Sequence, residues 1–120
     1  MLVRLRRAYE PPEPGDGVRV LVDRIWPRGR SREDLRIDQW ARELGPSDEL
    51  RRWFDHDPAR WEEFRARYRR ELAAPDQAGR LDALAGRARH GTVTLVYGAR
   101  DEEHNQARVL AEELERRLRD

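Results

Sequence analysis

The sequence contains neither cysteine nor lysine. Without cysteine the chain cannot form disulfides, use a thiolate nucleophile or bind zinc through sulfur. Without lysine it cannot form a Schiff base or supply the lysine of a phosphate-binding P-loop. All 25 basic side chains are therefore arginines, whose planar guanidinium suits carboxylates and phosphates. Codon bias would produce the same composition, so the arginine content alone does not indicate a ligand.

Long apolar segments and serine nucleophiles are also missing. No apolar run approaches the roughly 20 residues that a membrane helix needs. The first ten residues alternate Leu, Val and Arg and lack the apolar centre of a secretion signal. We therefore expect a cytoplasmic protein without a membrane partner. Ser31 and Ser47 are the only serines, and neither lies in a Gly-x-Ser-x-Gly motif.

The overall charge is nearly balanced, with 25 basic and 24 acidic residues and a net charge of +1. Nucleic-acid-binding domains usually have a clear basic excess, so nucleic acid is not the favoured partner. The charged fraction is high at 41%, but four Trp, three Tyr and two Phe argue against disorder. A chain of 120 residues has the size of one domain, and we expect residues 1–120 to form it.

Three short segments have the composition of β-strands. Residues 2–6 alternate apolar side chains with arginine, which is typical of a half-exposed edge strand. Residues 18–23 and 92–97 are β-branched and mostly apolar, which predicts interior strands. Residues 11–17 are rich in Pro and Gly and predict a loop.

Five helices are predicted from capping residues and apolar spacing. Their expected starts lie near Ser31, Ser47, Asp57, Gln77 and Asp101. The first would extend into the weakly periodic residues 35–44. Strands followed by long helices require crossover connections. We therefore predict a small three-layer α/β domain, with a mostly parallel sheet of three or four strands flanked by helices.

One helix has an apolar stripe at helical spacing, which we interpret as core. The stripe consists of Trp61, Phe64, Tyr68 and Leu72.

Side chains that could bind a ligand or take part in catalysis follow the two interior strands. Ligands of open parallel sheets bind beyond the carboxyl ends of the strands, so segments 23–29 and 97–105 should share one edge. In the first segment, Asp23 can pair with Arg24 and aim it at a ligand. Trp26 offers a stacking plane and Arg28 a second guanidinium. The alternative is a salt-bridged turn with Trp26 in the core.

In the second segment, Gly98 permits a tight turn and Asp101 is expected to cap the last helix. His104 lies three residues after Asp101, within reach on one helical turn. It is either a partly buried structural histidine or an acid–base group. His56 lies in an Asp-His-Asp run, but a metal needs about four converging ligands, which consecutive residues rarely supply. We therefore expect no metal and no cofactor.

The run Asp-Arg-x-Trp-Pro-Arg-Gly ending at Gly29 resembles the signature of a known family. Segments 38–40, 46–51, 64–72 and 94–107 follow in that family's order. The chain is similar to the YeaO-like family, domain of unknown function 488 (DUF488). The resemblance implies a small bacterial or archaeal cytoplasmic α/β protein with no settled activity. Its motifs match Asp23, Arg24, Trp26, Arg28, Arg51, Tyr97 and Asn105, whereas His56 and His104 lie beside them, which disfavours a histidine-centred mechanism.

Two functional hypotheses remain. The first is a site for a small anionic or nucleotide-like ligand, whether or not the protein is an enzyme. The expected ligand-binding residues are Arg24, Trp26, Arg28, Arg51, Tyr97, Arg100 and Asn105, and the catalytic candidates are Asp23, Asp101 and His104. The second is a non-enzymatic module that binds nucleic acid or protein. A concave pocket would favour the first and a flat basic face the second. The sequence leaves the oligomeric state open.

We predict that the purified, untagged protein carries no stoichiometric transition metal. Cysteine is absent, and the Asp-His-Asp spacing suits a metal poorly. Elemental analysis would test this, and about one tightly held ion per chain would contradict it.

Overall fold

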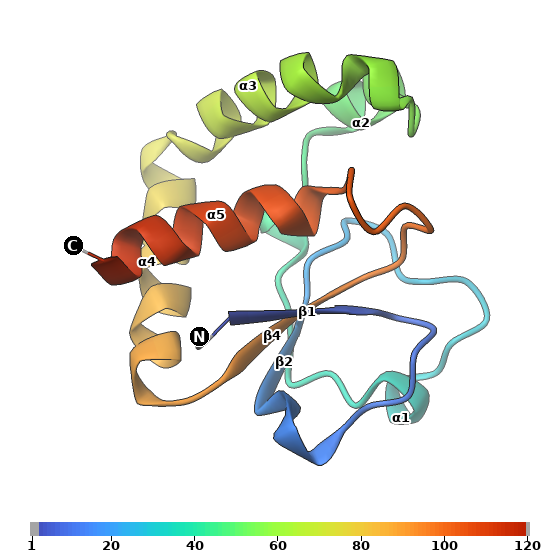
Figure 1. Ribbon diagram of the computed structural model, residues 1–120, viewed down its shortest axis with the longest axis vertical. Helices are drawn as coiled ribbons and strands as arrows, with labels where there is room; N and C mark the ends of the chain where they lie inside the picture. Colours follow the sequence, from blue (N-terminus) through green and yellow to red (C-terminus); the bar gives the residue numbers. More distant parts are fainter. Residues whose placement is uncertain (1–2, 120) are drawn as a thin grey trace.

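The computed structural model describes residues 3–119, which contain a four-stranded sheet in the order β1-β4-β2-β3 (Figure 1). The strands are β1 (Val3–Arg7), β2 (Val18–Leu21), β3 (Gln39–Trp40) and β4 (Val93–Tyr97), and every pairing is parallel. The predicted α/β class and parallel sheet are confirmed. The first strand lies at an edge, and β2 and β4 are interior. Leu2, which we counted in the first strand, lies outside the described residues.

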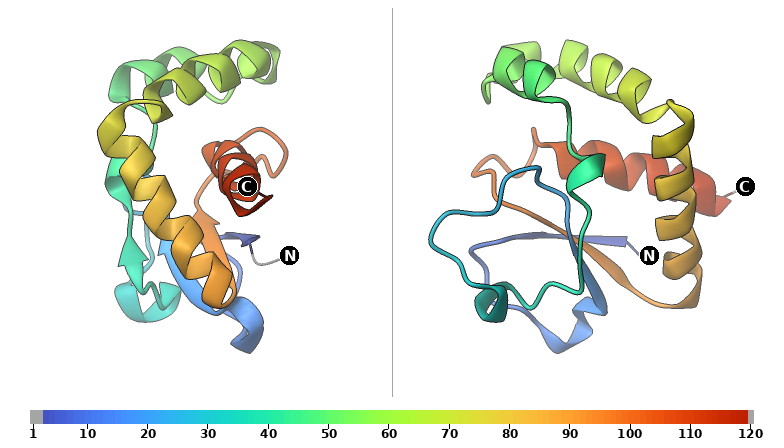
Figure 2. Two further views of the ribbon diagram at one scale, coloured as in Figure 1. Left: turned by 90° about the vertical axis from the view of Figure 1, so that its left-hand side faces the viewer. Right: turned by 180° about the vertical axis from the view of Figure 1, so that it is seen from behind.

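The helices are distributed unevenly over the two faces of the sheet. They are α1 (Arg32–Leu35), α2 (Asp48–Phe54), α3 (Trp61–Leu72), α4 (Pro75–His90) and α5 (Gln106–Arg119), with short 3-10 turns η1 (Pro14–Asp16), η2 (Arg42–Leu44) and η3 (Pro58–Arg60). Helices α2 to α5 lie on one side, and the short α1 lies on the other (Figures 1 and 2). The third layer of the predicted sandwich is therefore thin. Between residues 3 and 119, no helix combines the length and apolar character needed to cross a bilayer.

Side chains alternate between two core clusters along β4, as the two-residue period of a strand requires. Val93, Leu95 and Tyr97 pack in the larger cluster with α2 to α5. Val96 packs in the smaller one, with Leu35 of α1. All five residues of β4 are buried, so β4 is the central strand of the fold.

Two of the predicted helix starts, at Ser31 and Ser47, are confirmed by their caps, whereas Asp57 caps the 3-10 turn η3 and α3 itself begins at Trp61. The side chains of Ser31, Ser47 and Asp57 each accept a hydrogen bond from a backbone N–H of the turn that follows. Each cap satisfies an N–H that has no partner within the helix.

The expected helical continuation through residues 35–44 is wrong. Helix α1 ends at Leu35, and Arg36 adopts a left-handed conformation with φ 48°. The Asp38 N–H then donates to the Arg19 carbonyl at 2.9 Å, which brings the chain alongside β2 as strand β3. Pairing with a sheet edge therefore outweighs the weak helical periodicity of this segment.

The last helix begins at Gln106, five residues later than the sequence suggested. Asp101 Oδ1 accepts hydrogen bonds from the N–H groups of Glu103 and His104, which forms a separate turn. Asn105 is the actual cap, because its Oδ1 accepts from the Arg108 N–H at 3.1 Å. Asp101 therefore caps a turn and not the helix.

The apolar stripe of α3 is core except at its first residue. Phe64, Tyr68 and Leu72 are buried, whereas Trp61 is only partly buried against the larger cluster. Trp61 is therefore a packing residue, as the stripe predicted, but it is not fully buried. Its replacement by Ala should cost less than the roughly 3–5 kcal/mol typical of a buried aromatic.

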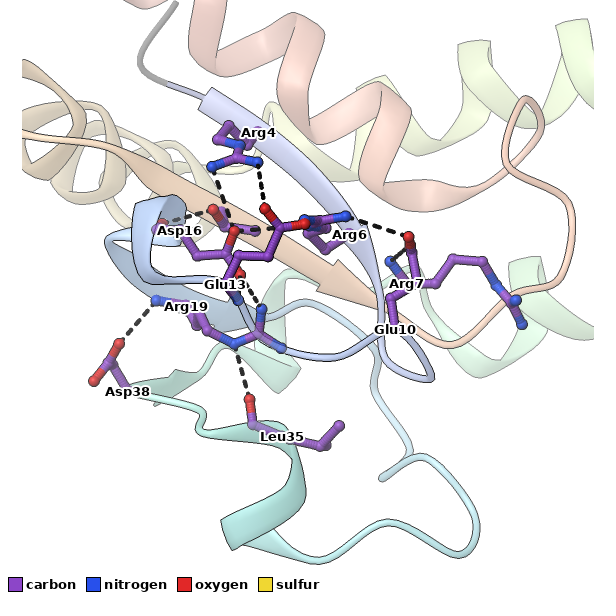
Figure 3. Close-up of polar contacts among 10 residues, drawn as sticks. Arg4, Arg6, Arg7, Glu10, Glu13, Asp16, Arg19, Leu35 and Asp38 are labelled. Carbon is purple, nitrogen blue, oxygen red and sulfur yellow. Dashed lines mark hydrogen bonds and ion pairs between the residues drawn. The ribbon is translucent and has the colours of Figure 1, made fainter.

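On the α1 side of the sheet, a single carboxylate gathers arginines from two strands (Figure 3). Asp16 is 1% exposed, and its Oδ2 lies 2.6 Å from Nη1 of Arg19. Its Oδ1 lies 3.4 Å from Nη1 of Arg4 and 3.7 Å from Nε of Arg6. Glu13 pairs with Arg4 and Arg6 and covers the cluster from the solvent side. The alternating arginines of β1 thus lie on the sheet under the loop that the proline-rich segment forms.

We predict that Asp16→Asn lowers the free energy of unfolding by about 3–5 kcal/mol, because it leaves the buried Arg19 guanidinium without a counter-charge. Asp82→Asn is the matched control. Asp82 is exposed and pairs with Arg117 at 2.9 Å, so its loss should cost under about 1 kcal/mol. Urea unfolding of both variants measures the difference, and equal costs would contradict a central role for Asp16.

Candidate functional site

A cavity of about 730 Å³ lies at the carboxyl edge of the sheet. Its walls come from the segments after β1, β2 and β4, from α2 with the turn that follows it, and from α3. The predicted residues that line it are Asp23, Arg24, Trp26, Arg28, Arg51, Arg100, Asp101, His104 and Asn105. Segments 23–29 and 97–105 therefore lie together, as their positions after interior strands predicted.

The register of β4 explains why these segments meet. Arg7 of β1 pairs with Tyr97, and Leu21 of β2 pairs with Val96, so all three strands end at the same level. The Val22 N–H extends the ladder by donating to the Val96 carbonyl at 3.0 Å. The segments that follow the three strands are thus neighbours at one edge of the sheet.

Asp23 connects two of these chains. Its Oδ2 accepts from the Gly98 N–H at 2.8 Å, and its Oδ1 accepts from the Gln106 side-chain amide. A Cβ on residue 98 would lie 2.8 Å from Asp23 Oδ2, so a larger residue there would displace the carboxylate. Burial raises the pKa of Asp23 from 3.8 to about 6, although both hydrogen bonds act in the opposite direction.

The expected Asp23–Arg24 ion pair does not form. Arg24 instead donates from Nε to the Pro46 carbonyl at 2.9 Å and from Nη2 to the Gly45 carbonyl at 2.8 Å. These bonds hold the guanidinium in the cavity wall without neutralising it. The sequence could not predict them, because carbonyl acceptors leave no signature in residue type.

The other cavity arginines also lack a close buried counter-charge. Arg51 meets only the exposed Asp48, at 3.4 Å. Within residues 3–119, the guanidinium groups of Arg28 and Arg100 make no hydrogen bond or ion pair. The cavity thus brings four arginines together with only two carboxylates, and one of these has a raised pKa. Its net charge favours anions.

Apolar side chains form the rest of the wall. Phe54 and Phe64 stack with ring centroids 4.3 Å apart, and both line the cavity. Tyr9 and Ile25 are the large apolar side chains exposed among the described residues, at 42% and 57%, and both also line the cavity. Exposed apolar surface that gathers at one site is typical of a binding surface.

Trp26 is packed in the fold and also reaches the cavity. Its Nε1 donates to the Arg30 carbonyl at 2.6 Å, and its ring meets Trp40 edge-on at 5.2 Å. It therefore packs against the smaller core cluster and also lines the cavity.

Asp101 and His104 form a hydrogen-bonded pair in the cavity wall. His104 Nδ1 lies 2.9 Å from Asp101 Oδ2, and this bond is the main cause that lowers the pKa of Asp101. The imidazole meets the Trp61 ring edge-on, with centroids 5.3 Å apart. The pair is structural, since Asp101 organises the turn, and it also leaves an imidazole at the cavity.

The side chains of two predicted ligand-binding residues make contacts within the fold. Tyr97 does not line the cavity, because the strand period directs it into the larger core cluster, where it is 3% exposed. Asn105 lines the cavity but is 1% exposed, and both ends of its amide are used, by Asp101 O and Arg108 N. Tyr9 and Gln106 were missed. Tyr9 follows a strand end, so the rule used for the other two segments would have found it.

His56 lies in the cavity wall in a left-handed conformation, with φ 54°. Across residues 3–119, no three His, Asp or Glu side chains are grouped closely enough to hold a metal ion.

We predict that the stability of the wild type relative to Asp23→Asn falls as pH rises from about 4 to about 6. The folded state holds the Asp23 proton more tightly than the unfolded chain does. This stabilisation is therefore present at low pH and is lost as the pH rises through the pKa of Asp23 in the folded state. A shift of this size corresponds to about 3 kcal/mol at most. Urea unfolding across this range measures it, and a constant difference between the two proteins would contradict it.

Comparison with known proteins shows relatives of nearly the same length. A family described as the inactive DUF488-N3 subclade matches residues 2–120. The uncharacterised protein Rv3073c of Mycobacterium tuberculosis (strain H37Rv) is 44% identical over 110 residues, covering 92% of this chain and 91% of its own. The uncharacterised protein YeaO of Escherichia coli (strain K12) is 42% identical over 112 residues, covering 93% and 96%. No solved structure matches. The chain therefore belongs to the DUF488 family of YeaO-like proteins, in the subclade described as inactive DUF488-N3.

Proposed function

We propose that this protein binds a small organic anion with a flat or apolar part, such as a nucleotide-like compound, in the cavity at the carboxyl edge of the sheet. The observation that carries this proposal is the gathering of four weakly neutralised arginines beside apolar side chains. A guanidinium can give two parallel charge-assisted hydrogen bonds to a phosphate or carboxylate. Phe54, Ile25 and Tyr9 supply surface for the remainder of the ligand.

The shape of the site supports a small molecule over a macromolecule. Ligand pockets usually measure about 300–1,000 Å³, are mostly apolar and contain a few convergent polar groups. The cavity, of about 730 Å³, fits this description. The net charge of +1 gives no independent support for nucleic acid.

Binding without chemistry is the form of the proposal that the family favours, because its subclade is described as inactive. The cavity lining is consistent with this description, since among the described residues it includes no serine, threonine, cysteine or lysine. Asp101 and His104 could exchange protons with a ligand, but among residues 3–119 no serine, threonine, cysteine or lysine nucleophile lines the cavity with them.

A protein partner is the second candidate. Tyr9 and Ile25 are both well exposed and both line the cavity, so a partner could place an acidic segment over this surface.

A thermal-shift screen tests the proposal. Phosphate, pyrophosphate, citrate, AMP and ADP cover anions with and without an aromatic part, and a specific ligand raises the melting temperature by mass action. We expect the nucleotides to exceed the inorganic anions, because only they also contact the apolar wall. An unchanged melting temperature with all five would contradict the proposal.

We predict that Arg28→Ala and Arg100→Ala each weaken the best ligand about tenfold or more, since each removes charge-assisted hydrogen bonds. Both side chains are exposed, so each variant should change the free energy of unfolding by under about 0.5 kcal/mol. Arg80→Ala is the control, because Arg80 is exposed on α4 and does not line the cavity. Calorimetric titration and urea unfolding measure both effects. If Arg28→Ala destabilises the protein as much as Phe64→Ala, Arg28 is structural.

A further inference from the structure

His104 has a fixed orientation at the cavity. Its Nδ1 is held by Asp101 Oδ2 at 2.9 Å, and its ring is packed against Trp61. Asp101 is itself fixed, because its Oδ1 accepts hydrogen bonds from two backbone N–H groups. Among the described residues Nε2 has no hydrogen-bond partner, so it is the ring nitrogen left for a ligand. A carboxylate bound to one imidazole nitrogen favours a proton on the ring and orients the other nitrogen.

The charges around His104 oppose one another. The neighbouring charged and titratable groups are Asp101 and Arg100 after β4; Asp23, Arg24 and Arg28 after β2; Arg51 and His56 of α2 and its following turn; and Arg65, whose guanidinium lies 6.0 Å from the Trp61 ring centre. Asp101 favours the protonated imidazole, whereas the arginines disfavour it while the cavity is empty. An anion placed among the arginines would cancel their effect and accept a hydrogen bond from protonated Nε2.

The geometry points to His104 as a binding residue that takes up a proton when an anion occupies the cavity, so that affinity for the anion depends on pH. This inference rests on the proposed function. Because binding free energies are reciprocal, proton uptake on binding requires tighter binding at lower pH. Asp23 would act in the same direction, since its protonation also removes negative charge from the cavity, and the experiment must separate the two groups.

The probe for this coupling is 2-naphthalenesulfonate. Its sulfonate stays ionised between about pH 5.5 and 8, so any pH dependence in this range comes from the protein. Its ring suits the apolar wall. The chain has only His56, His90 and His104, so each imidazole can be followed by proton NMR and assigned with single variants.

With saturating probe, we expect the titration midpoint of His104 to move to higher pH by about one unit, and that of the exposed His90 to stay in place. A change of one unit corresponds to binding about tenfold tighter at the acidic end of the range. Calorimetry in two buffers with different heats of ionisation should show proton uptake in the wild type.

Substitutions separate this role from a structural one. His104→Gln should still bind the probe but should lose the part of the proton uptake that is due to His104. That part is measured separately in Asp23→Asn, which lacks the contribution of Asp23. His90→Gln should behave as the wild type. Asp101→Asn keeps the imidazole but removes the carboxylate, so uptake should move to lower pH. This second variant tests the inference even if His104→Gln does not fold.

Binding with an unchanged His104 midpoint, or with equal proton uptake in wild type and His104→Gln, would overturn the inference and leave the proposed function standing. Absence of any probe binding across the pH range, together with a negative ligand screen, would remove both.

Discussion

The site depends on one constraint, the parallel pairing of β1 and β2 with the buried strand β4 between them. Because the three strands end in register, the chains leaving them are brought to one edge. The Asp23 carboxylate then joins the chain after β2 to the chain after β4 through Gly98 and Gln106. The cavity is therefore a consequence of sheet topology, and one half-buried acid links its two sides.

Arginine has two different roles in this protein. On the α1 side of the sheet, Arg4, Arg6 and Arg19 surround Asp16, so their charges are compensated within the fold. At the carboxyl edge, Arg28 and Arg100 have no such partner among the described residues. Both groups contribute equally to composition and net charge. Only the second group is available to an anion, which is why the balanced overall charge is compatible with a cationic cavity.

The sequence predicted the sheet and the location of the site better than the individual roles of site residues. Position after an interior strand correctly placed Arg28 and His104 at the cavity. The same rule misplaced Tyr97, because the last residue of a strand points to the face that its parity dictates, here the core. Residues 35–44 were misread because the weak local pattern could not reveal that a sheet edge was available to them.

Short-range patterns alone determined the interior strands, the caps at Ser31, Ser47 and Asp57, and the absence of thiol and amine chemistry. They could do so because each depends on residue type or on neighbours within one or two turns of the chain. Only the tertiary structure decided that Arg24 binds carbonyls, that Asp23 bonds to Gly98 and Gln106, and that Tyr9 reaches the same cavity. Those outcomes depend on contacts between segments far apart in the chain, and such contacts exist only once parallel pairing has brought the strand ends together.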